Sequence, residues 1–200
     1  MSNAISDIEE TLIELLRADM SEISIKPEEI QLLSPSDAAG KDVRLTLYLY
    51  SVIESPSLKN EPMQFVTAKE AKRPPLFLDL YFMLTCHPKL GESDLDKRSQ
   101  EDRQVLGRAM RVFYDNGILK GSLLKGKLTD TIEELRLSLN PINLEDLTRI
   151  WSVFPDTPYR TSVSYLVTPT RIESLRTAGS QRVVSKDARY SEMISNRKES

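Results

Sequence analysis

The segment that most constrains the fold lies between Pro74-Pro75 and Pro88. Every even position from 76 to 86 is apolar, whereas the odd positions mix apolar, acidic, hydroxyl and imidazole side chains. Alternation with a period of two over this length is typical of a long strand with one buried face. Proline cannot donate a hydrogen bond to a strand ladder, so the flanking prolines bound the strand. We expect residues 76–86 to form the central strand of a sheet.

The same kind of pattern predicts the other elements. Short alternating runs bounded by turn residues predict four further strands, at 29–33, 43–53, 135–139 and 159–172. Apolar residues at three- and four-residue spacing predict helices over 4–20 and 99–116 and a short helix after Asn143. We expect strand 43–53 to form an antiparallel hairpin with the central strand. The result is an α+β fold, with a mixed, mainly antiparallel sheet of four to five strands and two or three helices.

Capping signals mark the expected helix starts, because a short polar side chain followed three residues later by an acidic one suits a first turn. These pairs are Ser6 with Glu9, Ser99 with Asp102, and Asn143 with Asp146. On the short third helix, one face is expected to carry Leu144, Leu147, Trp151 and Phe154. Spacing of this kind favours a core position for Trp151 and, second, a role as an interface anchor.

Composition describes an ordinary soluble globular protein of 200 residues, 40% of them hydrophobic and 28% charged. No apolar run reaches the roughly 18 residues that span a bilayer, and the N-terminus lacks the pattern of a signal peptide. A net charge of -3 argues against broad nucleic-acid binding. One cysteine excludes an internal disulfide and fits a reducing cytoplasm.

The last segment, 175–200, differs from the rest of the chain. It holds 6 basic and 3 acidic residues, whereas residues 1–174 hold 21 basic and 27 acidic ones. Its apolar residues are too scattered to offset the entropy of ordering the backbone, so we expect an extended arm beside a domain at 1–174. The arm could order by joining the sheet edge of another chain. The predicted partner-binding residues are Arg182, Val183, Val184, Lys186, Arg189 and Tyr190.

No group of residues predicts catalysis, a cofactor site or a metal site. His87 is the sole histidine and adjoins Cys86, but neighbours on a strand point to opposite faces and cannot form a nucleophile–base pair. Asp79 and the serines at 162 and 164 are interpreted as ordinary sheet-face residues. The chain therefore gives no sequence evidence of an enzyme.

Residues 121–128 match the first seven positions of the phosphate-loop pattern. Leu128 occupies the eighth position, where a serine or threonine would hold magnesium. A helix rather than a strand precedes the segment, so we interpret it as a basic, solvated turn.

Three ordered blocks of sequence resemble one known family. The first is Pro74-Pro75-Leu76 with Asp79-Leu80-Tyr81, and the second runs from Leu106 to Val112 and on to Asp115-Asn116. The third begins at Leu137-Ser138-Leu139 and continues through Asn143–Leu147, Ile150–Ser152 and Pro158–Tyr165 to Ile172-Glu173-Ser174. In order and spacing, these blocks are similar to the tail-terminator, or cap, proteins of phage-tail-like extracellular contractile injection systems.

The resemblance covers about residues 1–174 and implies a structural, non-enzymatic role. It implies a homo-oligomeric ring, expected to be hexameric, that ends the inner tube and contacts the last layer of sheath. The partners would be copies of this chain, the tube protein and the sheath protein, without nucleic acid or membrane. The protein would be cytoplasmic during assembly and then part of a released extracellular particle, with 175–200 reaching a neighbour.

Two other interpretations stay open at this point. One is an adaptor or baseplate-associated component of the same particle. The other is a small-molecule enzyme whose site is too dispersed in the sequence to recognise.

Overall fold

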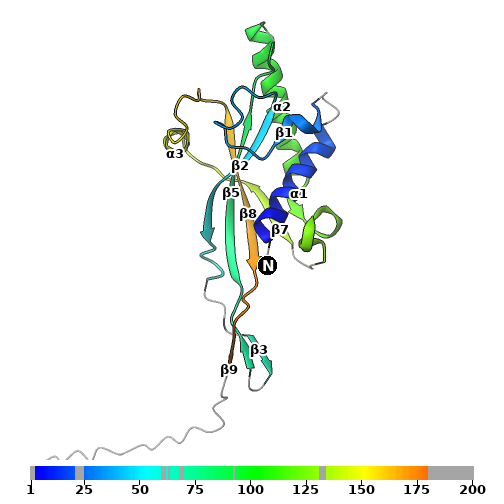
Figure 1. Ribbon diagram of the computed structural model, residues 1–200, viewed down its shortest axis with the longest axis vertical. Coiled ribbons are helices and arrows are strands. Elements are labelled where there is room, and N and C mark those ends of the chain that lie inside the picture. The colour runs from blue at the N-terminus through cyan, green and yellow to red at the C-terminus, as the bar shows by residue number, and fades with distance from the viewer. Residues whose placement is uncertain are drawn as a thin grey trace, which may run out of the picture. The chain divides into compact units, whose positions relative to one another are not determined.

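The computed structural model describes residues 3–20, 25–59, 62, 64–67, 70–91, 93–130 and 134–179. The chain divides into two compact units, one formed by residues 1–61 and 75–173 and the other by 62–74 and 174–200. Figure 1 shows the helices and strands of both units.

The first unit is built on a six-stranded sheet in the order β1-β2-β5-β8-β7-β6. The strands are β1 (Ile30–Gln31), β2 (Leu45–Glu54), β5 (Leu76–Cys86), β6 (Ile118–Leu119), β7 (Leu135–Leu139) and β8 (Ser162–Ile172). All neighbours pair antiparallel except β1 and β2, which are parallel. The predicted hairpin and the central position of β5 are confirmed. The strand count exceeds the prediction because β6 has only two residues and leaves no periodic signal.

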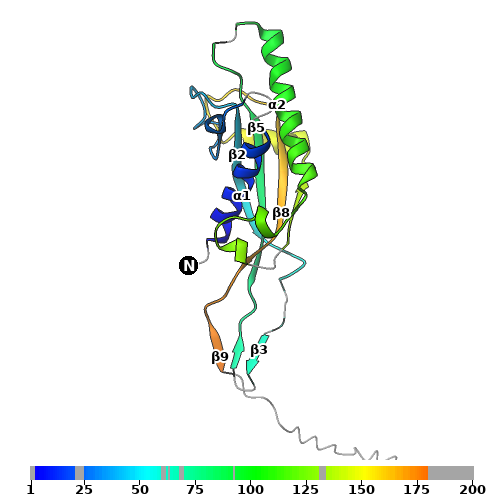
Figure 2. The same cartoon turned by 90° about the vertical axis from the view of Figure 1, so that its right-hand side faces the viewer.

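Two helices cover one face of this sheet, α1 (Ala4–Asp19) and α2 (Leu95–Asp115). Their apolar stripes meet the even-numbered side chains of β5 in one cluster, here called the first core. Members from the three elements include Ile8, Leu12, Leu16, Val105, Ala109, Phe113, Leu80, Phe82 and Leu84. Figure 2 shows α1 and α2 beside the strands of the sheet. The α+β fold class is confirmed.

A third helix, α3 (Leu144–Trp151), packs on the opposite face of the sheet. Met83 of β5 is fully buried there together with Leu147 and Trp151, so the sheet has a second core. The prediction of one buried face for β5 is therefore wrong at its centre, because α3 covers the face with odd-numbered residues. The expectation that every even-numbered residue of β5 is buried also fails at Leu76, the first residue of the strand, which is 42% exposed.

The helix starts only partly follow the capping signals. Asn143 accepts a hydrogen bond from the Asp146 amide at 2.8 Å, as predicted. The helix α1 begins directly after Asn3, so Ser6 lies inside it. Ser99 likewise lies inside α2, whose N-cap is Asp94. The carboxylate of Asp94 accepts from two first-turn amides at 3.0 and 3.1 Å, which moves the helix start to an earlier residue.

Removing this cap tests the assignment. Asp94→Ala is expected to lower the free energy of unfolding by about 1 kcal/mol, because it leaves first-turn amides without a protein acceptor. Ser99→Ala is the matched control and should change it by less than about 0.5 kcal/mol. Urea unfolding followed by circular dichroism measures both. A larger loss in the Ser99 variant would contradict the cap assignment.

The second unit contains a small antiparallel sheet in the order β3-β4-β9. Its strands are β3 (Gln64–Thr67), β4 (Glu70–Lys72) and β9 (Thr177–Gly179). The Arg73 amide donates to the Arg176 carbonyl at 3.4 Å, next to the β4–β9 pairing. The six predicted partner-binding residues between 182 and 190 lie outside the described residues.

Candidate interaction site

Trp151, the other residue predicted to bind partners, lies in the second core and is 6% exposed. Its ring meets Phe154 at 6.0 Å and Tyr159 at 5.3 Å between centroids, both edge-on. Tyr48 of β2 extends the group, with its ring 5.7 Å from Phe154. Edge-to-face contacts of this kind add to the stabilisation from burial. These aromatic contacts hold α3 on the sheet.

One residue of the predicted α3 face is not in this cluster. Leu144 is 72% exposed, whereas Leu147 and Phe154 are buried. Leu144 is the first residue of the helix, directly after the Asn143 cap, and the expectation that it packs with the other three is wrong.

The role of Trp151 as packing is testable. Trp151→Ala should lower the free energy of unfolding by about 3–5 kcal/mol, because it removes a large buried ring. Leu144→Ala, on the same helix but exposed, should change it by less than about 0.5 kcal/mol. Thermal and urea unfolding of the two variants provide the comparison. A stable Trp151 variant with altered assembly would instead identify the ring as an interface anchor.

A strip of buried polar side chains crosses one end of the face that carries the second core. Thr46 Oγ1 and His87 Nε2 lie 3.0 Å apart, and Thr85 Oγ1 and Ser162 Oγ also lie 3.0 Å apart. Arg44 Nε donates to the His87 carbonyl at 3.0 Å. These contacts satisfy polar groups that would otherwise destabilise the fold when buried. The polar strip therefore has a structural explanation.

The same geometry argues against a Cys86–His87 catalytic pair. Cys86 belongs to the first core, whereas the His87 ring contacts Thr46. Burial raises the pKa of the Cys86 thiol to about 12, so the thiol stays protonated at neutral pH. Burial and, second, the charge of Arg160 lower the pKa of His87 to about 4, so its ring stays neutral.

Burial of neutral His87 predicts how stability depends on pH. The unfolded chain gains a proton near pH 6.5, whereas the folded chain resists protonation until about pH 4. Stability should therefore fall as the pH falls through this window, by up to about 3 kcal/mol. His87→Asn should reduce the slope, measured by urea unfolding at several pH values. Parallel pH profiles for the two proteins would contradict the assignment, since the chain has no other histidine.

The segment resembling a phosphate loop docks on α1. The Lys127 amide donates to the Asp7 carboxylate at 3.1 Å, and the Lys125 amide donates to Thr11 Oγ1 at 3.0 Å. Gly126 has a φ of 59°, and a β-carbon there would meet Asp7 Oδ1 at 2.4 Å. The backbone therefore binds the chain's own carboxylate where a phosphate loop would bind its ligand. The expectation of a solvated turn holds for residues 121–123, 126 and 127, which are exposed, and fails at Leu124 and Leu128, which are buried.

Asp79 is buried and accepts a hydrogen bond from Thr168 Oγ1 at 2.5 Å. The register between β5 and β8 shifts at this point, between Leu78 and Leu80. Ser164 lies on β8 and contacts Tyr50 Oη at 2.8 Å. These residues have structural partners, and the described residues contain no cluster of three or more potential metal ligands.

The clearest opening in the first unit is the outer edge of β2, which sequence analysis did not identify. Strand β1 pairs only with Leu45 and Thr46. Within the described part of the chain, no strand pairs with that edge from Leu47 to Glu54. An edge of this kind presents unpaired amides and carbonyls that another strand can use. The sequence gives only a weak signal for this open edge, because the length of edge left uncovered depends on where β1 ends.

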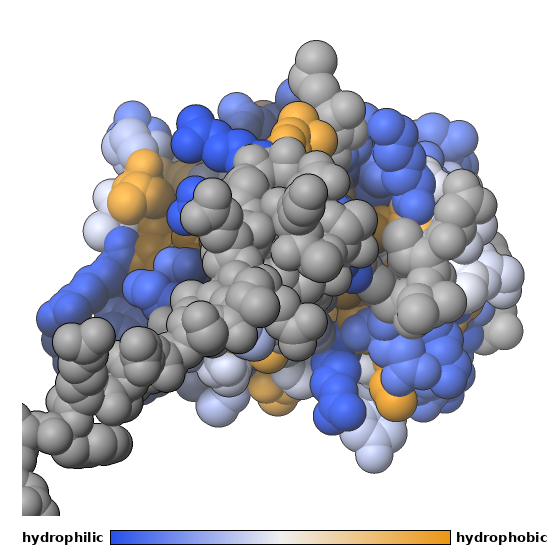
Figure 3. Space-filling view, turned by 90° about the horizontal axis from the view of Figure 1, so that it is seen from below, coloured by the Kyte–Doolittle hydropathy of each residue, from blue (hydrophilic) through white to orange (hydrophobic). Residues whose placement is uncertain are grey.

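A cavity lies on each side of this edge. On the α1 side, a cavity of about 340 Å³ is lined by residues 32–34, which follow β1, by residues 47–49 of β2, and by Glu9 and Asp37. On the α3 side, a cavity of about 310 Å³ is lined by Tyr48, Tyr50, Arg149, Ile150, Val153 and Phe154. Together, the edge and its two cavities are called the β2 groove. Exposed apolar residues on another face of the molecule form separate patches among polar ones (Figure 3).

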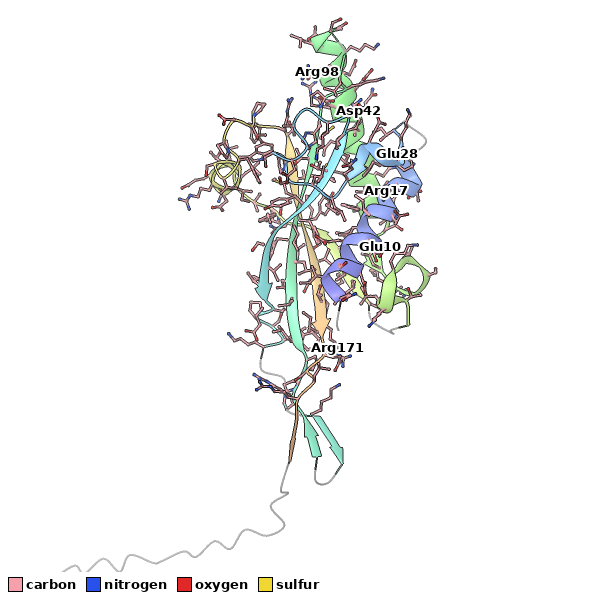
Figure 4. All side chains as sticks on the ribbon, in the orientation of Figure 1. Glu10, Arg17, Glu28, Asp42, Arg98 and Arg171 are labelled. Atoms are coloured by element: carbon pink, nitrogen blue, oxygen red, sulfur yellow. The ribbon has the colours of Figure 1, made fainter. Side chains whose placement is uncertain are left out.

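Charged contacts hold the border of the β2 groove in place. Arg17 of α1 donates to the Pro27 carbonyl at 3.1 Å and to the Ile30 carbonyl at 3.0 Å. These bonds tie α1 to the turn η2 (Pro27–Glu29) and to β1. Figure 4 labels Arg17 and Glu28 in this region. The turn before β1 and the first residue of β1 are thereby tied to α1.

A larger cavity of about 600 Å³ lies near the start of α2. Arg44 and Glu101 are among its charged lining residues, together with Lys89 and Asp42. The Arg44 guanidinium already contacts Asp102 at 3.2 Å and the His87 carbonyl, so its charge is balanced within the fold. No helix in the described ranges combines the length and apolarity needed to cross a bilayer.

The fold and the site define an α+β domain with a two-sided core and an open sheet edge suited to protein docking. The chain belongs to the Pvc16 N-terminal domain family, whose sequence profile matches residues 7–186. A comparison with curated proteins finds no match.

Two solved structures share the fold. One is the sheath/tube terminator of an extracellular contractile injection system, PVC, in its extended state, with a TM-score of 0.61 at 17% identity. The match covers 96% of this chain and 64% of that one. The other is the tube-terminating cap of the anti-feeding prophage, with a TM-score of 0.57 at 18% identity. That match covers 92% of this chain and 61% of the cap, so this chain spans under two thirds of either terminator.

Proposed function

We propose that this protein is a structural, non-enzymatic cap of a contractile injection particle. Copies assemble into a ring, expected to be hexameric, that ends the inner tube and anchors the last sheath layer. The particle is assembled in the cytoplasm and then released. Residues 175–200 serve as an arm that joins neighbouring subunits.

The fold comparison is the observation that carries this proposal. Two structures described as terminators share the fold over more than nine tenths of this chain. Family membership over residues 7–186 extends the likeness into the arm.

The chemistry of the described residues agrees with a docking role. Cys86 is protonated and buried, His87 is neutral and buried, and the glycine-rich loop at 121–128 binds Asp7. The β2 groove, by contrast, offers an open backbone edge beside apolar cavities. An acidic body and a basic arm also favour contact between neighbouring subunits.

The decisive experiment is the mass of the purified protein in solution, with negative-stain images and a tube-growth assay on the same sample. We expect a ring of six copies that stops growth of tubes made from the particle's own tube protein. A chain ending at Gly179 should keep its fold, because β9 is retained, but attach sheath more weakly. Uncapped tubes at saturating concentrations of the protein would contradict the proposal. Unchanged sheath attachment in the shortened chain would exclude the arm from this role.

A further inference from the structure

The β2 groove has the geometry of an acceptor for one added strand. Among the described residues, no strand pairs with its edge from Leu47 to Glu54, and the far side of β2 is already paired with β5 along most of its length. A strand added to such an edge gains a ladder of backbone hydrogen bonds, and its side chains point alternately to the two faces. The added strand must therefore carry side chains that fit the cavity on each face of the sheet.

The two cavities specify adjacent apolar residues in that occupant. Leu47 and Leu49 face the α1 side of the edge, whereas Tyr48 and Tyr50 line the cavity on the α3 side. Consecutive residues of an added strand would enter opposite cavities. A pair of small, β-branched apolar residues fits this demand, because such side chains favour strands.

The groove also specifies charge on the α1 side. Glu9 and Asp37 are the charged residues lining that cavity, and both are acidic. Burial raises the pKa of Glu9, which is half-buried and has no ion-pair partner among the described residues. A cation placed beside it would relieve this cost. The occupant should therefore carry basic residues on the face that enters this cavity.

One segment of the chain matches both demands. Val183 and Val184 are adjacent, and Arg182 and Lys186 fall on the same side of an extended strand as Val184. If Val184 enters the α1-side cavity, Arg182 and Lys186 lie two residues away on either side of it. The basic side chains therefore fall beside the acidic cavity whether the added strand runs parallel or antiparallel to β2. Asp187 falls on the opposite side with Val183, where Arg149 lines the cavity.

We propose that residues 182–187 of one copy bind as a strand in the β2 groove of a second copy. This inference rests on the proposed ring. In a head-to-tail ring each copy offers one donor segment and one acceptor groove, so every site is filled when the ring closes. Only Ser180 and Gln181 separate the donor segment from β9, so Arg182 can lie at most about 11 Å from Gly179. Strand exchange therefore requires the acceptor groove of the second copy to lie close to β9 of the first.

A labelled peptide of residues 180–190 tests the assignment by fluorescence anisotropy. The acceptor is the full chain carrying Val183→Asp and Val184→Asp, so that its own segment does not compete. The peptide should bind, and Glu9→Lys in the acceptor should weaken binding about five-fold or more. Glu10→Lys is the matched control on the same helix, exposed and outside the groove, and should change binding by less than about two-fold (Figure 4).

Charge reversal on both partners supplies a second readout. A peptide carrying Arg182→Glu and Lys186→Glu should bind the Glu9→Lys acceptor more tightly than the natural peptide does. No binding, equal losses in the Glu9 and Glu10 variants, or binding to purified sheath protein alone would each overturn the inference. Rings that cap tubes without peptide binding would overturn strand exchange and leave the proposed function intact. Peptide binding without capped tubes would support exchange and contradict the cap.

Discussion

The pairing of β5 with β2 on one side and β8 on the other is the constraint on which the first unit depends. Because β5 lies between two long strands, its backbone is paired along both edges and its side chains contribute to both cores. On one face, Phe82 and Leu84 pack against α1 and α2. On the other face, Met83 packs against α3. The three helices are thus held together through one strand, although they are far apart in the sequence.

Burial of both faces requires the polar side chains of this sheet to find hydrogen-bond partners within the fold. Thr46, Thr85 and Ser162 are strand residues that a half-exposed sheet would leave in water, and here they pair with one another or with His87. The same burial raises the pKa of Cys86 and lowers the pKa of His87, so near neutral pH the thiol is protonated and the imidazole is neutral.

The short strand β1, which covers only the start of the β2 edge, is tied to α1. Arg17 binds carbonyls of the preceding turn and of Ile30, and the chain then leaves β2 after two paired residues. Strand edges of this kind are usually covered, because they invite association. In the described part of the chain, this edge lies uncovered beside two cavities, and the proposed strand exchange would cover it.

The sequence by itself determined the α+β class, the long strands, the β2–β5 hairpin and the approximate helices, because these depend on local periodicity and turn residues. It also carried the resemblance to terminator proteins, which rests on ordered blocks across the chain. It misplaced the start of α2, since Asp94 and Ser99 both fit the cap pattern and it is the Asp94 carboxylate that accepts the first-turn amides.

Only the tertiary structure decided that β5 is buried on both faces, that the loop at 121–128 binds Asp7, and that β1, among the described strands, covers only the start of the outer edge of β2. Each of these features depends on segments that are distant in the chain, and no local sequence pattern encodes which distant segment a residue will contact.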